Sequence, residues 1–594
     1  MSLTYEGRGI SAGIGIGLAS VLPDVRIDYP EEKVDPEEAD EEFEDFKQAL
    51  DRAKTTTGRI KDQAQENFQD SLSNLFSVQE MILEDPLFIE GVRQRIQSEL
   101  LCAESAVIET LQGIRAEFAS KTEDTPINTR KIDIMDAGWR VLRHLDTSMF
   151  SPRLPQDGVI VAVDLMPSMA VRLEDTSIEG VIIQNVDRSS HIAVITQALE
   201  IPTVGIMDNQ FYREVDPGTR LIVGANQNRV IVDPDKDTIK AHEEARNQYF
   251  EFTRELQDKT QDLGPDDLSI TVRSNLGFLS EVSMVKRHGG FGSGLVRTEF
   301  LFMAHSAEYP DYETQRNVYG QLSESLQPHP VTLRTFDLGG DKTGFESDVA
   351  FLSDDNGQGR GISRSLQDED ELRTQLRAML DTHKEYGNVR LLLPMVGSPD
   401  EVKQVRSLIN ELTEDIGVEV PELGVIVEIP SLVFMLEDLA GLVDFLSIGT
   451  NDLMYYLIGA DRFAWQDRDF VDLPDPALLR CINKIAQQSE ELGLSVSVCG
   501  EIAGNPLFTP VFMGMDVAEL SMSPIRIPEV KLVASLCNDQ DAQQFANRAI
   551  QLTGRNELVN WVHEDLTPYI ENLFNNSNLL HQDQDIHAIT GGMM

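Results

Sequence analysis

Residues 180–205 read GVIIQNVDRSSHIAVITQALEIPTVG, and this stretch sets the fold of the region around it. Its first five residues form an apolar, strand-like run. Ser189 or Ser190 is a preferred N-cap residue, and apolar side chains then recur at helical spacing until Pro202 ends the helix. A strand, a turn and a short capped helix in this order predict an α/β domain.

His191 lies in the first turn of this predicted helix. The free backbone N–H groups and the positive end of the helix dipole at that place favour an anion. A phosphoryl group carried on the imidazole would therefore be stabilised there. A histidine at a helix start more often only packs against its neighbours, so the choice depends on the rest of the chain.

Size and cysteine usage limit the class of protein. At 594 residues the chain is too long for one hydrophobic core, and about three domains are expected. No apolar run is long enough to span a bilayer, and the glycine-rich residues 9–22 are typical of strand and turn rather than of a signal peptide. The cysteines at 102, 481, 499 and 537 have no paired spacing, which favours a reduced, cytoplasmic protein without a structural disulfide or zinc site.

The charge balance excludes two classes of partner. The chain has 50 Lys and Arg residues against 100 Asp and Glu residues, and its net charge is −50. Such a surface repels nucleic acid and anionic membranes and favours basic partners. We therefore expect a protein that binds neither nucleic acid nor a membrane.

Residues 36–146 have a different character, because polar and apolar residues alternate there at helical spacing. Pro86 and Pro126 separate the helical stretches, which are 86–99, 102–119 and 128–145. Strand-like runs lie on both sides, so this region is predicted to be an all-helical insert that interrupts the α/β domain. Periodicity does not tell whether the insert is a structural bundle or a docking surface for a partner protein.

The residues that follow the α/β domain predict a linker helix and a barrel. Residues 236–260 are charged, contain neither Gly nor Pro, and predict a connecting helix. From about residue 262 to residue 572, eight short strands alternate with helical stretches, which suits a (β/α)₈ TIM barrel. The predicted strands are Ser269–Leu276, Ser293–Glu299, Val331–Asp337, Arg390–Val396, Gly424–Ile429, Phe445–Asp452, Ser495–Glu501 and Glu519–Ser523. Predicted helices include 371–383, 400–415, 431–440 and 476–492.

Polar residues gather at the ends of these predicted strands. In a TIM barrel the chemistry lies at the C-terminal ends of the strands. The residues at those ends are Arg297 and Glu299, Arg334 and Asp337, Glu428, Asn451 and Asp452, and Cys499 and Glu501, with Arg462 a little beyond. Any one of these charges alone is better explained as a surface ion pair. Together, on five strand ends, they predict an active site.

The residue types at this rim point to a phosphorylated, anionic ligand. Arginine forks bind carboxylate and phosphate oxygens bidentately. Glu428 and Asp452 offer two hard oxygen ligands for Mg²⁺, which bridges to substrate phosphate. A phosphate ester that carries a carboxylate, such as phosphoenolpyruvate, fits. Cys499 is either a buried packing thiol, the common case, or a proton donor for the enolate that phosphoryl transfer leaves.

A barrel that binds a phosphoryl donor and a separate domain with His191 suggest one mechanism, in which His191 receives the group and passes it on. The connecting helix would then be a swivel. The predicted fold is α/β and multidomain, with a swivelling phosphohistidine domain that carries an all-α insert, followed by the TIM barrel. The predicted boundaries are 1–24 and 147–235 for the phosphohistidine domain, 25–146 for the insert, 236–261 for the linker helix, 262–572 for the barrel and 573–594 for a tail.

Specific motifs in nearly every part of the chain carry a resemblance. They are Ser190-His-Ile-Ala, Gly294-Leu-Val-Arg-Thr-Glu-Phe-Leu-Phe-Met303, Arg334-Thr-Phe-Asp-Leu-Gly-Gly-Asp-Lys342, Gln375-Leu-Arg-Ala, Val427-Glu-Ile-Pro430, Ser447-Ile-Gly-Thr-Asn-Asp-Leu453 and Cys499-Gly-Glu-Ile-Ala-Gly504. With these motifs the sequence resembles enzyme I of the bacterial phosphoenolpyruvate–sugar phosphotransferase system.

The resemblance implies a role for each motif residue. His191 would be the phosphohistidine, through its Nε2 atom, and Cys499 the proton donor. The insert would dock the small carrier protein HPr, the barrel would form a homodimer, and the reaction would be the first step of sugar uptake. The residues implied to bind phosphoenolpyruvate are Arg297, Arg334, Asn451, Asp452 and Arg462, and those implied to hold Mg²⁺ are Glu428 and Asp452.

The sequence departs from the family pattern at three places. Asn185-Val186 stands where the family has Gly-Gly, Thr196-Gln197 where it has Ala-Arg, and Gly359-Arg360 where it has Gly-Trp-Arg. A regulatory paralogue that binds phosphoenolpyruvate and a carrier, with weak or altered transfer, is therefore the alternative function. A third hypothesis is an enzyme that acts on a small acceptor. Pyruvate phosphate dikinase and phosphoenolpyruvate synthase share the histidine and barrel domains, but their nucleotide-binding domain has no room here.

Overall fold

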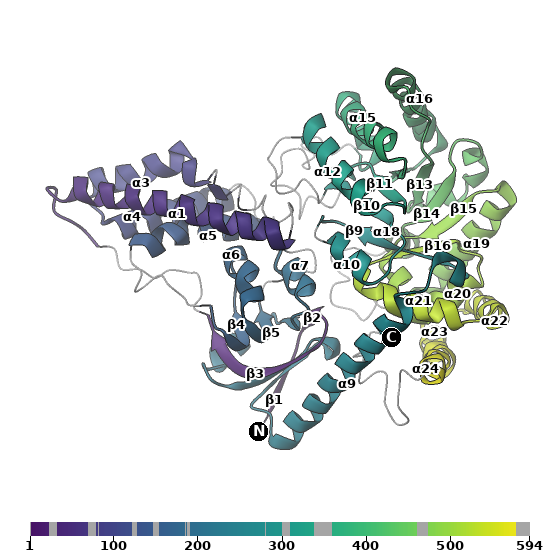
Figure 1. The fold of residues 1–594 in the computed structure, drawn as a ribbon, viewed down its shortest axis with the longest axis horizontal. Helices are drawn as coiled ribbons and strands as arrows, with labels where there is room; N and C mark the ends of the chain where they lie inside the picture. The colour runs from purple at the N-terminus through teal and green to yellow at the C-terminus, as the bar shows by residue number, and fades with distance from the viewer. Residues whose placement is uncertain are drawn as a thin grey trace.

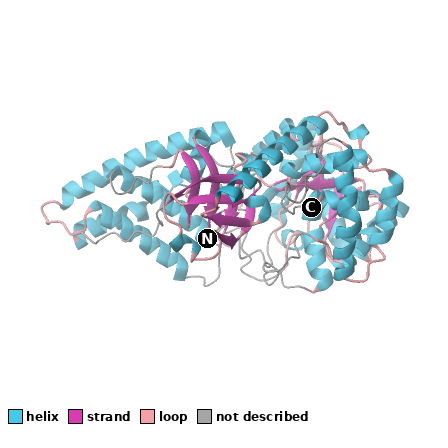
Figure 2. Ribbon diagram, turned by 90° about the horizontal axis from the view of Figure 1, so that it is seen from below, coloured by secondary structure: helices cyan, strands magenta, loops and turns pink. Residues whose placement is uncertain are grey.

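A computed structural model of the chain describes residues 2–22, 32–68, 76, 79–80, 82–120, 127–145, 154–184, 186, 191–279, 281–299, 309–337, 359–459 and 473–577. The helical insert, the α/β domain and the barrel follow one another along the long axis of the molecule (Figure 1). Figure 2 shows the same order, with the sheet of the α/β domain between two largely helical parts. The predicted fold class is confirmed.

The α/β domain contains an eight-stranded sheet with the order β1-β8-β7-β3-β4-β5-β6-β2. Its strands are β1 (Leu3–Glu6), β2 (Arg8–Ser11), β3 (Ile14–Val21), β4 (Asp157–Ala162), β5 (Ser177–Ile183), β6 (Thr203–Gly205), β7 (Arg220–Gly224) and β8 (Arg229–Val232). β3 and β4 are parallel neighbours, although the whole insert separates them in the chain. A β-carbon at Gly15 or Gly17 would collide with the backbone of Glu179 or Gly158, which explains the glycines of β3.

Short helices connect these strands. They are α6 (Pro167–Ala170), α7 (His191–Ala198) and α8 (Phe211–Glu214). α6 does not continue as an α-helix, because it gives way to a 3₁₀ turn over Val171–Asp175. The side chains of Val171 and Leu173 are buried in that turn, so packing rather than helical periodicity sets its conformation.

The insert consists of long helices around an apolar core. The described ones are α1 (Ala39–Phe68), α3 (Pro86–Glu99), α4 (Ala103–Ser120) and α5 (Ile127–Leu145), and the last three closely match their predicted bounds. Asp136 of α5 joins the insert to α6, because its Oδ1 accepts a hydrogen bond from Ser168 Oγ at 2.5 Å and its Oδ2 accepts one from Ser168 N at 3.0 Å. α6 in turn packs against α7, so the insert is tied to the helix of His191.

Helix α9 (Lys236–Thr260) runs from the α/β domain to the barrel, as predicted (Figure 1). Its N-cap Asp235 accepts a hydrogen bond from Thr238 N at 2.8 Å. Near its middle, Arg246 pairs with Glu179 of the α/β domain at 2.7 Å. Phe252 and Leu256 are buried in the barrel core, so the second half of the helix is part of the barrel's packing.

Eight parallel strands close into a barrel, which confirms the predicted strands one by one. They are β9 (Thr271–Leu276), β10 (Ser293–Arg297), β11 (Val331–Arg334), β12 (Val389–Leu393), β13 (Leu423–Val427), β14 (Phe445–Ile448), β15 (Ser495–Val498) and β16 (Glu519–Met522). β9 ends where it was predicted to end, and each of the others ends one or more residues earlier. Most of the polar residues at the predicted strand ends therefore belong to the loops and helices that follow.

Helices surround the barrel. They are α10 (Glu281–Arg287), α12 (Tyr312–Ser325), α14 (Ile362–Ser365), α15 (Glu369–Tyr386), α16 (Pro399–Ile416), α17 (Pro430–Val433), α18 (Thr450–Ile458), α19 (Pro476–Leu492), α20 (Thr509–Met513), α21 (Ile527–Leu536), α22 (Asp539–Ala549), α23 (Arg555–Trp561) and α24 (Thr567–Asn576). Three of the four predicted ones, 371–383, 400–415 and 476–492, lie within three residues of the observed bounds of α15, α16 and α19. The helix predicted over 431–440 is wrong as one element, because α17 ends at Val433 and a 3₁₀ turn follows over Leu436–Leu439. Within the described residues, no helix combines the length and the apolar character that crossing a membrane needs.

The barrel floor, at the N-terminal ends of the strands, contains a buried ionic network. Glu519 accepts hydrogen bonds from Arg273 at 2.7 Å and from Arg390 at 3.1 Å. The Arg390 guanidinium also lies over the Phe445 ring, 3.9 Å from its centroid. Burial works against the charge of Glu519, but the hydrogen bonds and charges of the two arginines lower the pKa of its carboxyl below the ordinary 4.5.

Replacing Glu519 by Gln is expected to lower the free energy of unfolding by about 3 kcal/mol at neutral pH, because two buried guanidinium groups lose their anion. The lowered pKa means that this stabilisation is present above pH 4.5 and disappears as the pH falls through the pKa of the folded state. Urea unfolding of wild type and variant at several pH values measures the difference. Glu422→Gln, which removes an exposed partner of the same Arg390, should change stability by less than about 1 kcal/mol.

Candidate active site

Two arginines stand side by side at the C-terminal rim of the barrel. Arg297 ends β10 and Arg334 ends β11, and their Cα positions are partners in the register of the two strands. Arg334 is buried and pairs with Glu299, and its Nη1 lies 3.4 Å from Asp337 Oδ2. Burial alone would lower the pKa of Arg334, but the neighbouring carboxylates raise it. Arg334 is therefore a permanent cation beneath the rim.

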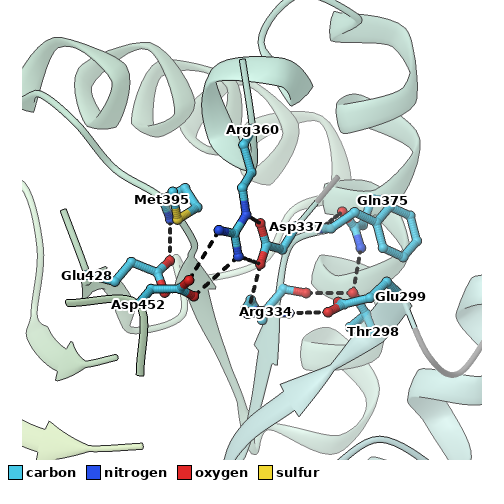
Figure 3. Close-up of polar contacts among 10 residues, drawn as sticks. Thr298, Glu299, Arg334, Asp337, Arg360, Gln375, Met395, Glu428 and Asp452 are labelled. Carbon is cyan, nitrogen blue, oxygen red and sulfur yellow. Dashed lines mark hydrogen bonds and ion pairs between the residues drawn. The ribbon is translucent and has the colours of Figure 1, made fainter. Parts of the chain in front are cut away.

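Glu428 and Asp452 bring two carboxylates to the next part of the rim. Glu428 follows β13, and Asp452 lies with Asn451 in the first turn of α18, after β14. Glu428 Oε1 accepts a hydrogen bond from Met395 N at 2.6 Å (Figure 3). Burial, followed by the negative charge of Asp452, raises the pKa of Glu428. The two carboxylates thus repel one another, and a divalent cation between them would relieve that repulsion.

Arg360 belongs to the same cluster, although its sequence position gave it no role in the prediction. Its guanidinium donates to both oxygens of Asp337, at 3.1 Å each, and to both oxygens of Asp452, at 3.2 Å each. Figure 3 shows it between the two carboxylates. In the sequence, Arg360 could be noticed only because Gly359-Arg360 stands where the family has Gly-Trp-Arg.

Further polar groups, reaching in from the surrounding helix α15, hold the rim in place. Gln375 of α15 donates to Thr298 Oγ1 at 3.2 Å and accepts from Phe336 N at 3.1 Å. Thr298 Oγ1 donates in turn to the carbonyl of Arg334 at 2.7 Å (Figure 3). These bonds fix the loops in which the charged residues lie, and Gln375 belongs to one of the family motifs quoted above.

Cys499 follows β15, and its side chain is buried at the C-terminal end of the barrel. Its Sγ lies 3.6 Å from the Ile448 carbonyl, and its own carbonyl accepts a hydrogen bond from Asn275 Nδ2 at 2.9 Å. Burial raises the pKa of the thiol to about 11, against smaller lowering effects of Ser447, Arg334 and Arg297. The proton therefore stays on sulfur throughout the neutral range, as a proton donor requires. Asn275 was not singled out from the sequence.

Asn451 Oδ1 accepts a hydrogen bond from Glu501 N at 3.2 Å, so the turn of α18 and the loop after Cys499 are linked. A β-carbon at Gly500 would collide with Thr450, which accounts for glycine between Cys499 and Glu501. The structure thus brings six predicted site residues to one end of the barrel: Arg297, Arg334, Glu428, Asn451, Asp452 and Cys499. The seventh barrel residue, Arg462, lies outside the described residues.

α7 is described from His191 onward, and it confirms that a short helix carries His191. Only its backbone position belongs to the described structure, and Asn185 and residues 187–190 lie outside it. Gln197, which replaces the family's arginine, donates to the carbonyl of Ile10 at 2.8 Å. The side chain of Gln197 therefore fastens α7 to β2.

The donor set suits Mg²⁺ better than a metal that binds to a closed protein cage. Among the described residues, no group of three or more His, Cys, Asp and Glu side chains could hold a metal ion. Mg²⁺ is usually held by one or two carboxylates and completes its sphere with water and substrate oxygens. The repelling pair Glu428 and Asp452, beside three arginines that suit an anionic substrate, fits that pattern.

Comparison with known proteins gives three domain matches. Residues 6–130 match the N-terminal domain of PEP-utilising enzymes, residues 154–235 match their mobile domain, and residues 253–538 match their PEP-binding domain. The three matches follow the order of helical insert, α/β domain and barrel in the structure. Together they cover the rim described above and the helix of His191.

Similar proteins extend over nearly the full chain. The phosphoenolpyruvate-protein phosphotransferase of Priestia megaterium is 31% identical over 580 residues, which cover 94% of this chain and 99% of that protein. That of Bacillus subtilis, strain 168, is 30% identical, and the match covers 94% of this chain and 99% of that protein. That of Staphylococcus epidermidis is also 30% identical, and the match covers 95% of this chain and 100% of that protein. The chain belongs to the family of PEP-utilising enzymes, among the phosphoenolpyruvate-protein phosphotransferases.

Proposed function

We propose that this protein transfers the phosphoryl group of phosphoenolpyruvate to His191 and then to a histidine of a carrier protein of the HPr type. The observation that carries the proposal is the rim of the barrel, where Arg297, Arg334, Glu428 and Asp452 meet. This cluster suits a small ligand with both phosphate and carboxylate groups. The reaction would be the first step of sugar uptake by a phosphotransferase system.

Binding of phosphoenolpyruvate depends on the cations of the rim. Arg297 and Arg334 lie in register and bind its anionic groups, and Asn451 and Arg462 complete the contacts. Glu428 and Asp452 would hold Mg²⁺, which would supply positive charge beside the phosphoryl oxygens. The pairs of Arg334 with Glu299 and Asp337 keep its guanidinium in place before the substrate arrives.

The chemical step exchanges one bond to phosphorus for another. Nε2 of His191 forms the new bond to phosphorus while the bond from phosphorus to the enol oxygen breaks. The enolate that leaves takes a proton on carbon from Cys499 Sγ and becomes pyruvate. The phosphoryl group then passes from His191 to the carrier, and the start of α7 stabilises its charge in the meantime.

The tasks of this cycle are divided among the domains. Residues 1–24 and 147–235 carry the phosphohistidine, residues 25–146 dock the carrier, 236–261 serve as the swivel, and 262–572 bind phosphoenolpyruvate and form the homodimer. The tail, 573–594, has no assigned task. The net charge of −50 suits a basic carrier surface. The described cysteines are all free, which suits the reducing cytoplasm.

The regulatory alternative receives no support from the relatives cited above, because all of them carry the name of the transferring enzyme. Gln197, one of the departures that raised it, is explained by its hydrogen bond to Ile10. The deciding experiment follows pyruvate release from phosphoenolpyruvate and Mg²⁺ with and without an HPr-type carrier. Many turnovers that require the carrier support the proposed enzyme, whereas at most one turnover per protein supports the regulatory paralogue.

Replacing Cys499 by Ser is expected to lower kcat about 10²-fold or more while KM changes less than about threefold, because a hydroxyl is a far weaker acid than a thiol. Steady-state pyruvate release measures both constants. Cys481→Ser, a change at a partly buried thiol of α19, serves as the control. A Cys499→Ser enzyme with wild-type kcat would remove the proton-donor role.

A further inference from the structure

We propose that the Arg360 guanidinium is an internal counter-cation that occupies Asp452 until a divalent metal displaces it. This proposal rests on the proposed metal site of Glu428 and Asp452. It adds that Arg360 blocks this site in the protein without metal. Metal binding then requires that Asp452 exchange one cation for another.

The contacts of Arg360 cover the oxygens that a metal would need. Its Nη1 donates to Asp452 Oδ1 and its Nη2 to Asp452 Oδ2, each at 3.2 Å. The same guanidinium holds Asp337 through Nε and Nη2 (Figure 3). A bidentate pair of this kind is among the stronger charge-assisted hydrogen bonds. Asp452 therefore does not offer free lone pairs in the direction of Arg360.

The backbone of Arg360 is fixed to the loop that also fixes Glu428. Ile362 N donates to the Pro394 carbonyl at 3.2 Å, and Gly361, with φ 60°, packs so closely on Met395 that a β-carbon there would collide with it. Met395 N is the donor to Glu428 Oε1. The backbone next to Arg360 and the carboxylate of Glu428 thus share one anchor, the segment Pro394-Met395.

The exposure of Asp337 and Asp452 indicates which of these two carboxylates can separate from Arg360. The side chain of Asp337 is fully buried between Arg334 and Arg360, whereas that of Asp452 is 14% exposed in the first turn of α18. Separating Asp337 from Arg360 would break two charge-assisted hydrogen bonds of a fully buried carboxylate, which is costly. Asp452 is therefore the carboxylate that turns from Arg360 to the metal.

The charges of the groups determine whether the metal and the anion strengthen or weaken each other's binding. A guanidinium and a divalent cation repel one another when they share a carboxylate, so Arg360 weakens metal binding in the absence of substrate. An anionic ligand that arrives with the metal compensates the released guanidinium. Metal and anion are then expected to bind with positive cooperativity, and each raises the affinity of the protein for the other.

The test uses Mn²⁺ as the metal and the full-length protein without phosphoenolpyruvate, with free Mn²⁺ measured by electron paramagnetic resonance. In Arg360→Gln the affinity for Mn²⁺ is expected to rise at least tenfold. Arg360→Lys keeps the charge but not the bidentate hydrogen bonds to Asp452, and should raise the affinity for Mn²⁺ about threefold. The matched control is Arg390→Gln, which removes a buried, paired guanidinium at the opposite end of the barrel and should leave the affinity unchanged.

The direction of the change decides the inference. Unchanged or weaker Mn²⁺ binding in folded Arg360→Gln would overturn it, since a residue that only orients Asp452 would cost affinity when removed. If Arg360→Gln failed to fold, unchanged Mn²⁺ binding in Arg360→Lys would overturn the proposal instead. Only the binding that Glu428→Gln removes is counted, because a chain with net charge −50 also binds cations on its surface. If Glu428→Gln removes none, the proposed metal site itself is wrong.

Discussion

Glu428→Gln is expected to slow phosphoenolpyruvate-dependent phosphorylation at least about 10³-fold, the largest effect of any conservative change in the barrel. Glutamine has the shape of the acid and can still accept the hydrogen bond from Met395 N. It lacks the charge that the divalent cation requires. Because burial already raises the pKa of Glu428, the neutral side chain is accommodated and the variant should fold.

The matched control for this prediction is Glu422→Gln. Glu422 precedes the same strand, β13, but lies at the opposite end of the barrel, where its side chain is 62% exposed. Rates of phosphorylation at increasing Mg²⁺ concentration compare the three proteins. Wild-type rates for Glu428→Gln at ordinary Mg²⁺ concentrations would exclude Glu428 as a metal ligand.

His191→Ala is expected to abolish phosphorylation completely, because no other residue is proposed to form the bond to phosphorus. The same variant should bind phosphoenolpyruvate with an affinity close to that of the wild type. The binding residues come from β10, β11 and the segments after β13 and β14, whereas His191 begins α7 in another domain. The two roles are therefore separable.

Calorimetric titration of His191→Ala with phosphoenolpyruvate and Mg²⁺ measures this separation, since binding without transfer gives a simple isotherm. His242→Ala, a histidine in the first half of α9, is the control and should be phosphorylated like the wild type. Loss of phosphoenolpyruvate binding in a folded His191→Ala protein would contradict separate donor and acceptor sites.

The barrel strands could be predicted because each is a short apolar run between helical patterns, as in Val389–Leu393 or Leu423–Val427. Once their number and order suit a TIM barrel, the position of the polar residues behind them follows from geometry. For this reason Arg297, Arg334 and Glu428 could be assigned to one rim from the sequence alone. The same holds for α7, a helix predicted from the apolar periodicity before Pro202.

Arg360 could not be predicted in the same way. It reaches Asp337 and Asp452 across 23 and 92 residues of sequence. Its position depends on a glycine with positive φ and on the loop at Met395, which itself has φ 52°. Such a meeting of distant segments is set by tertiary packing, for which hydrophobic periodicity contains no signal. The hydrogen bond between Gln197 and Ile10 has the same origin.

The most direct test of the proposed transfer is the intact mass of the full-length protein after incubation with phosphoenolpyruvate and Mg²⁺, for wild type and His191→Ala. We predict a gain of one phosphoryl group on the wild type alone, and loss of that group in acid, as expected for a phosphohistidine. An acid-stable adduct, an adduct on both proteins, or no adduct on a wild type that still binds phosphoenolpyruvate would contradict it.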